Sequence, residues 1–148
     1  MSRELERSVV TEYFRATWNA NYSYAVAWPN HEFDTPVNSI FVVFNLVDRG
    51  TMRETLGRTY LKRHRGTIQV DIYVPQGLGT KTARQIADFL ENQFDSVDLP
   101  MGDGSYIFFR TPTSREIPAN VQRAANLDDN WYRYMVELPY DRQETVVR

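Results

Sequence analysis

The sequence lacks most of the residues on which chemistry in small proteins depends. It has 148 residues and no cysteine, which excludes disulfide bonds and thiolate metal sites. The two histidines, His31 and His64, are far apart, and we expect each to be an exposed structural residue rather than a base or a metal ligand. Because 17 basic residues stand against 19 acidic ones, the chain also lacks the basic excess of a dedicated nucleic-acid-binding protein.

Long apolar stretches are missing as well. No run approaches the roughly 20 residues needed to span a bilayer, and the charged residues 1–6 do not resemble a signal peptide. We therefore expect a protein that folds in a reducing cytoplasm and has no membrane partner. Aromatic residues, in contrast, make up 14% of the chain, and such residues are enriched in interfaces as well as in cores. The length predicts a single domain over residues 1–148.

Two segments have helical periodicity, residues 2–19 and residues 82–94. In the first segment the charged residues, Glu6 among them, are expected mainly on the side away from the core. In the second, Thr82 and Gln85 have the spacing of a capping box, and one apolar stripe is expected to face the core. The members of this stripe are Ala83, Ile86, Ala87, Leu90 and Phe94.

Strand patterns occupy much of the remaining chain. Residues 39–48 are apolar on both faces, which predicts a buried central strand. Residues 67–74 alternate as a half-buried strand, and we expect them to form a hairpin with residues 59–63 around a tip at residues 62–66. Further strands are expected at 97–101 on a sheet edge, at 106–110 and at 131–138; residues 113–129 show no strong period.

The last predicted strand should end at Pro139 and leave a frayed tail over residues 141–148. The order of helices and strands predicts an α+β fold, in which an antiparallel or mixed sheet carries the two main helices on one face.

Motifs for catalysis or for cofactor binding are broken or missing. The segment between residues 74 and 82 joins a strand to a helix, where a phosphate-binding loop would lie. However, Thr80 separates Gly79 from Lys81, and Val74 holds the place of the first glycine of that motif. No serine lies in a Gly-x-Ser-x-Gly turn. We therefore predict no catalytic residues, no metal ligands and no cofactor.

The densest positive patch lies at the predicted hairpin tip, and it consists of Lys62, Arg63, His64 and Arg65. It is either a solvated tip or a surface for a nucleic-acid backbone or an acidic partner. Asp128 and Asp129 are most simply solvated charges. Together with Trp131 they form an acidic and aromatic surface that could complement the basic tip of another copy of the chain.

The middle of the chain resembles a family of phage tail completion proteins. Members pass from a strand into a Gly-rich loop and then into an Ala-Ile-Ala-Asp helix. The corresponding residues are Gly66-Thr67-Ile68-Gln69-Val70-Asp71-Ile72-Tyr73-Val74-Pro75, then Gly77 and Gly79, then Ala83-Arg84-Gln85-Ile86-Ala87-Asp88. The first helix and the aromatic strand at residues 131–134 are similar in order and spacing, while the specific part of the match covers residues 66–90.

This resemblance implies a tail terminator of a phage or prophage. Such proteins have an α+β fold and form a ring, commonly a hexamer, that ends tail-tube growth and joins tail to head. The implied partners are other copies of the chain, the tail tube protein, the head–tail connector proteins and, in passing, phage DNA. The implied location is the virion tail or neck after assembly in the host cytoplasm.

Two other interpretations stay open at this point. One is a small nucleic-acid-associated module that uses residues 62–65. The other is a small enzyme whose site is assembled from Asp71, Arg110 and Glu137.

Overall fold

A computed structural model describes residues 2–29, 31–34, 36, 39–75, 80–102, 105–117 and 131–147. Within these ranges the chain forms two helices and one seven-stranded mixed sheet, which confirms the predicted α+β class. The elements are α1 (Ser2–Asn21), β1 (Ala25–Ala27), β2 (Phe41–Arg53), β3 (Thr59–Pro75), α2 (Lys81–Phe94), β4 (Asp98–Pro100), β5 (Tyr106–Phe109), β6 (Thr113–Ile117) and β7 (Trp131–Val147).

Two long strands, β3 and β7, form the backbone of the sheet. They pair antiparallel along their whole lengths, from Thr59 opposite Val147 to Pro75 opposite Trp131. The strand order is β1-β2-β3-β7-β5-β4, and β6 also pairs with β7. β1 pairs with β2 in parallel, and the other described pairings are antiparallel. The predicted central strand is β2, yet β1 covers it only over residues 41–43, so the middle of the sheet is β3.

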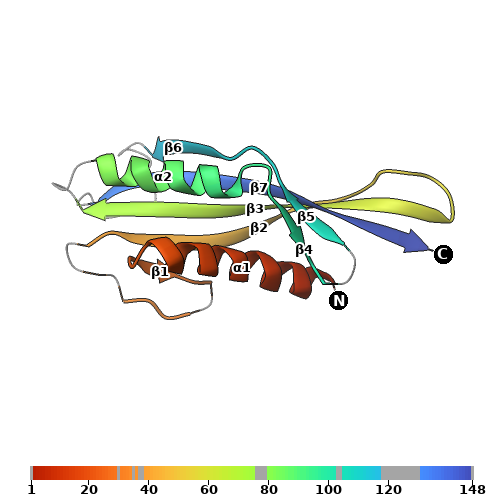
Figure 1. Cartoon of the computed structure of the whole chain (residues 1–148), viewed down its shortest axis with the longest axis horizontal. Coiled ribbons are helices and arrows are strands. Elements are labelled where there is room, and N and C mark those ends of the chain that lie inside the picture. The colour runs from red at the N-terminus through yellow and green to blue at the C-terminus, as the bar shows by residue number, and fades with distance from the viewer. Residues whose placement is uncertain are drawn as a thin grey trace.

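Both helices pack on the same face of the sheet (Figure 1). On this face, Phe44 of β2 lies opposite Val70 of β3, which in turn lies opposite Val136 of β7. α1 contributes Val10, Phe14 and Trp18 to the core. The five residues of the stripe predicted for α2 are all buried, which confirms the stripe. The helix itself begins after Thr80, whose side chain makes no capping hydrogen bond, so the capping box predicted at Thr82 is wrong.

The predicted hairpin within residues 59–74 is also wrong, because β3 runs through it without a break. The actual hairpin joins β2 to β3, and its turn lies at residues 54–58. Gly66 is a strand residue that faces the ring of Tyr140. A side chain at this position would overlap the Cζ, Oη and Cε1 atoms of that ring. A glycine within a strand often marks such a close approach rather than a turn.

The predicted strand end at Pro139 is wrong, because β7 continues through Pro139 to Val147 and takes up residues 141–147 of the tail predicted to be frayed. The carbonyl oxygen of Pro139 accepts a hydrogen bond from the backbone N–H of Arg110, so the carbonyl group of Pro139 points away from β3. Since β6 pairs with residues 133–137 and β5 with residues 140–142, the missing N–H of Pro139 lies at the break between these two neighbours. No ladder hydrogen bond is lost there, and the strand tolerates the proline.

Residues 50–53 of β2, 59–65 of β3 and 142–147 of β7 form a three-stranded extension of the sheet. Together with the turn at residues 54–58 we call this extension the arm. Figure 1 shows that it projects beyond the ends of both helices, with the C-terminal end of β7 beside the hairpin.

Candidate assembly surface

The predicted basic patch lies in the middle strand of the arm and not at a hairpin tip. Because side chains alternate along a strand, the patch divides between two faces. Arg63 and Arg65 lie on the helix-free face of the sheet, while Lys62 and His64 lie on the face that carries the helices. All four are only partly exposed. The interpretation as one solvated cluster is therefore wrong, as is the expectation that His64 is an exposed residue.

On the helix-free face, three arginines surround Asp141, a buried residue of β7. Arg110 donates from Nε to Asp141 Oδ2 at 2.7 Å, and nitrogen atoms of Arg63 and Arg65 each lie 4.0 Å from the same carboxylate. Arg63 also pairs with Glu54 of the hairpin turn at 2.6 Å. Two carboxylates of the same chain therefore offset much of the positive charge that the sequence places here.

On the opposite face of the arm, His64 bridges β2 and β7. Its Nδ1 lies 2.9 Å from Thr51 Oγ1, and its Nε2 lies 2.8 Å from Glu144 Oε2. The hydrogen bond with His64 is the main reason why the pKa of Glu144 lies below its usual value, although partial burial opposes it. These contacts connect all three strands of the arm.

A buried ion pair connects this network to the first helix. Arg142 of β7 is 1% exposed, and its Nε lies 3.3 Å from Glu6 Oε1 on α1. Glu6 is 5% exposed, so its expected place on the solvent side of the helix is wrong. Burial raises the pKa of Glu6, and the nearby Arg142 guanidinium opposes that rise. Arg142 Nη1 also lies 3.6 Å from Glu144, which continues the chain of charges into the arm.

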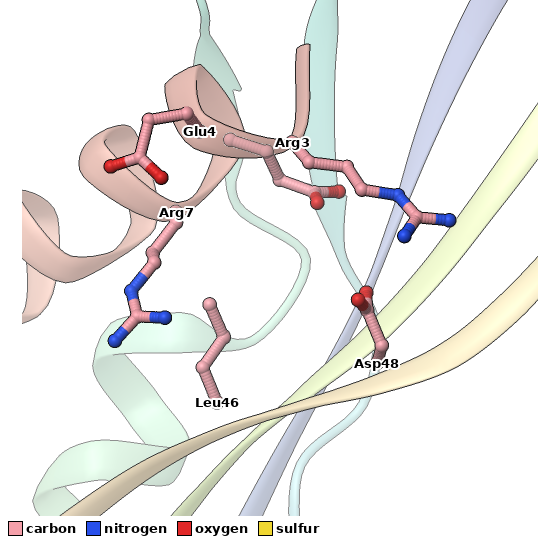
Figure 2. Close-up of a pocket in the computed structure, with 6 residues that line it drawn as sticks. Arg3, Glu4, Arg7, Leu46 and Asp48 are labelled. Atoms are coloured by element: carbon pink, nitrogen blue, oxygen red, sulfur yellow. The ribbon is translucent and has the colours of Figure 1, made fainter. Parts of the chain in front are cut away.

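A charged cleft of about 170 Å³ lies next to this pair, where the start of α1 meets β2 (Figure 2). α1 supplies two arginines and two glutamates, and β2 supplies Leu46 and Asp48. Arg3 and Arg7 thus share the cleft with three carboxylates, so its charge is mixed. Such a lining does not select one class of ligand.

The other predicted interaction residues lie elsewhere. Asp128 and Asp129 fall outside the described residues, as do Gly77 and Gly79 of the connecting loop. Trp131 opens β7 at the end of the sheet opposite the arm, where its ring meets that of Phe41 at 5.1 Å. Within the chain, the structure therefore does not bring Trp131 together with residues 62–65.

The residues proposed for an enzyme site have other neighbours in the sheet. Asp71 pairs with Arg133 at 3.1 Å, and burial raises the pKa of Asp71 while Arg133 opposes that rise. Arg110 pairs with Asp141, and Glu137 lies opposite Gln69 in the sheet. In the part of the chain that the structure describes, no group of three or more metal-binding side chains occurs, and no helix is long and apolar enough to cross a membrane.

Comparisons with known proteins identify the family of this chain. A family model described as phage tail terminator protein matches residues 7–140. The chain is therefore a structural protein of a bacteriophage tail. It belongs to the phage tail terminator family, which confirms the resemblance noted in the sequence.

The fold also has a counterpart among solved structures. One chain aligns with a TM-score of 0.68 at 24% sequence identity, and the alignment covers 97% of each chain. This likeness concerns the fold alone. Among the curated proteins, no match to this chain was found.

Proposed function

We propose that this protein assembles into a ring, hexameric by its resemblance to other tail terminators, that ends tail-tube growth and joins the tail to the head. The observation that carries the proposal is the family match over residues 7–140. The partners are further copies of the chain, the tail tube protein and the head–tail connector proteins. Passing contact with DNA is part of the same proposal.

The tip of the arm supports a role in protein contacts. Leu56 is 89% exposed and Met52 49% exposed, and large apolar side chains so exposed on a projecting element favour a partner surface. The tip is nevertheless well structured. Arg53 donates to the carbonyl oxygens of Thr55 and Gly57, both at 2.9 Å, and its guanidinium lies 4.0 Å from the centre of the Tyr60 ring.

The nucleic-acid alternative has less support, because the charges on which it depends are largely paired within the chain. Arg63 contacts Glu54 and lies near Asp141, and His64 contacts Glu144. A phosphate backbone would have to compete with these carboxylates for the same donors.

Deletion of the gene from the phage or prophage, followed by electron microscopy of the particles, tests the proposed function. We expect tails of irregular, extended length that are not joined to heads, and the wild-type gene supplied in trans should restore both properties. Head-joined tails of normal length in the absence of the gene would refute the terminator role.

The contribution of the arm tip can be tested by complementation with two variants at one site. Leu56→Ser should fail to restore head-joined tails, whereas Leu56→Met, which keeps an apolar side chain, should restore them. Because Leu56 is exposed, neither change should lower the melting temperature appreciably. Normal tails with Leu56→Ser would show that the tip is not a contact surface.

A further inference from the structure

The arm has two strand edges that lack a partner strand in the part of the chain described by the structure. On one side, β1 covers only residues 41–43 of β2, which leaves the arm segment 50–53 bare. On the other side, the pairing of β5 with β7 ends at Arg142, which leaves residues 143–147 bare. A bulge between Asp48 and Gly50 separates the bare arm segment of β2 from the rest of that strand.

The backbone hydrogen bonds of the sheet indicate which groups these edges present. The backbone N–H of Glu54 donates to the carbonyl oxygen of Leu61 on β3, so the backbone polar groups of Glu54 point toward β3. Because these groups alternate along a strand, those of Thr51 and Arg53 point away from β3. On β7, the carbonyl group of Pro139 points away from β3, and every second residue along the strand does the same. The backbone groups of Gln143 and Thr145 therefore point away from β3.

The two edges run in the same direction, because both β2 and β7 are antiparallel to β3. A rotation about an axis roughly along the strands preserves strand direction. It would place the β7 edge of one copy parallel to the β2 edge of the next, and this head-to-tail contact can close a ring. A two-fold contact between identical edges would instead be antiparallel and would end at a dimer.

Natural proteins protect free strand edges against pairing, often with a proline. Neither of these edges contains one, since their sequences are Gly50-Thr51-Met52-Arg53 and Gln143-Glu144-Thr145-Val146-Val147. Their charges are also complementary. Arg53 and Glu144 both lie on the side of the arm that faces the helices, each on its own edge. A second copy of the chain therefore fits these edges in backbone hydrogen bonding, and its Arg53 would add to His64 and Arg142, the cations that already lie beside Glu144.

We propose that neighbouring copies in the ring are joined by parallel pairing of residues 50–53 of β2 in one copy with residues 143–147 of β7 in the next. This inference rests on the proposed ring and specifies its subunit contact. Backbone hydrogen bonds would provide the contact, as in other cases of strand addition to a sheet edge. The complementary charges would fix its register.

Because the natural chain has no cysteine, introduced thiols can report on this contact without background. Met52 and Thr145 suit this purpose, since both lie on the helix-free side of the arm and both are exposed. Tails would be assembled in the deletion strain with Met52→Cys, with Thr145→Cys, or with both single variants together. A short bismaleimide would then join thiols that lie close to each other.

A head-to-tail contact predicts covalent dimers only where the two single variants are present together. A chain carrying both cysteines should give a ladder of higher multimers. Dimers from either single variant alone would indicate pairing of identical edges and would overturn the proposal. Head-joined tails without cross-links in the mixture would overturn the edge contact while the terminator function stands. Normal tails in the uncomplemented deletion strain would refute the function itself.

A proline variant tests the same edge independently. Thr145→Pro removes an N–H that points away from β3, so the ladder between β3 and β7 is retained. The matched control Thr145→Ala keeps this N–H. We expect both to melt alike and Thr145→Pro to raise the midpoint concentration of assembly by about tenfold or more, where tenfold corresponds to about 1.4 kcal/mol. Equal assembly of the two variants, measured by native mass spectrometry or on complemented tails, would overturn the proposal.

Discussion

Replacement of Arg142 by methionine should destabilise the protein strongly, because it leaves Glu6 buried without its partner. Arg142 is 1% exposed and its Nε lies 3.3 Å from Glu6 Oε1. Removal of one member of a buried ion pair typically costs about 3–5 kcal/mol. With a urea dependence of about 2 kcal/mol per molar, the unfolding midpoint should fall by about 1.5–2.5 M.

Two further variants separate the loss of the ion pair from other effects. The double variant Glu6→Leu with Arg142→Met removes both charges and should recover most of the stability. Arg142 Nη2 is buried without a hydrogen-bond partner, so the natural pair is itself imperfect and its replacement should cost little. As a surface control, Arg15→Met breaks the exposed pair with Glu12 and should change the stability by less than about 1 kcal/mol.

The pH dependence of Arg142→Met provides a second check. Burial raises the pKa of Glu6 in the folded protein, and without Arg142 nothing comparable opposes that rise. A folded state that binds a proton more tightly than the unfolded chain gains stability as the pH falls through the raised pKa toward 4.5. The deficit relative to wild type should therefore shrink between about pH 8 and pH 5. The lowered pKa of Glu144 acts in the opposite sense, but only below this window.

Chemical denaturation of wild type and variants, monitored by circular dichroism at both pH values, would measure these effects. A loss below about 1 kcal/mol for Arg142→Met would refute the idea that the pair is buried and coupled. The same conclusion would follow if the double variant were as unstable as the sum of its single changes.

Three other predictions concern the core, the β3–β7 contact and nucleotide binding. Leu90→Ala should cost about 2–5 kcal/mol in denaturant melts, because Leu90 is fully buried on α2, and a loss below about 1 kcal/mol would place the helix at the periphery. Gly66→Ala should cost about 1–3 kcal/mol through overlap with the Tyr140 ring, and much less once Tyr140→Val has removed that ring; full additivity of the two changes would contradict this contact. Calorimetry with ATP or GTP and magnesium should show no binding, and a micromolar signal that disappears with Lys81→Ala would reverse that expectation.

Local patterns identified the elements whose formation depends mainly on their own residues. The apolar stripe of α2 is buried as its spacing predicts, since a strongly amphipathic helix has only one face that it can turn to a core. The alternation of residues 67–74 correctly predicted a strand with one apolar face in the core, but the strand is not half-buried, because Thr67 and Asp71 on its other face are buried as well. The sequence alone likewise shows that cysteine is absent and that the phosphate-loop motif is incomplete.

Glycine and proline, which normally indicate turns and strand ends, were misleading where tertiary contacts allow them within a strand. Gly66 indicated a turn, but in the structure it makes room for the Tyr140 ring. Pro139 indicated a strand end, but its backbone faces a break between β5 and β6. The short strands β1 and β6 have no clear period of their own, and each is defined by the longer strand with which it pairs.

The charges of the arm show most clearly what only the tertiary structure decides. In the sequence, residues 62–65 form a basic run, whereas Asp141, Arg142 and Glu144 lie in the segment predicted to be a frayed tail. Pairing of β3 with β7 brings these segments together, although about 80 residues separate His64 from Glu144 in the chain. Composition and periodicity determined the class of fold and the helix that covers the sheet. Which charges face one another was set by the register between distant strands, and no local sequence pattern encodes that register.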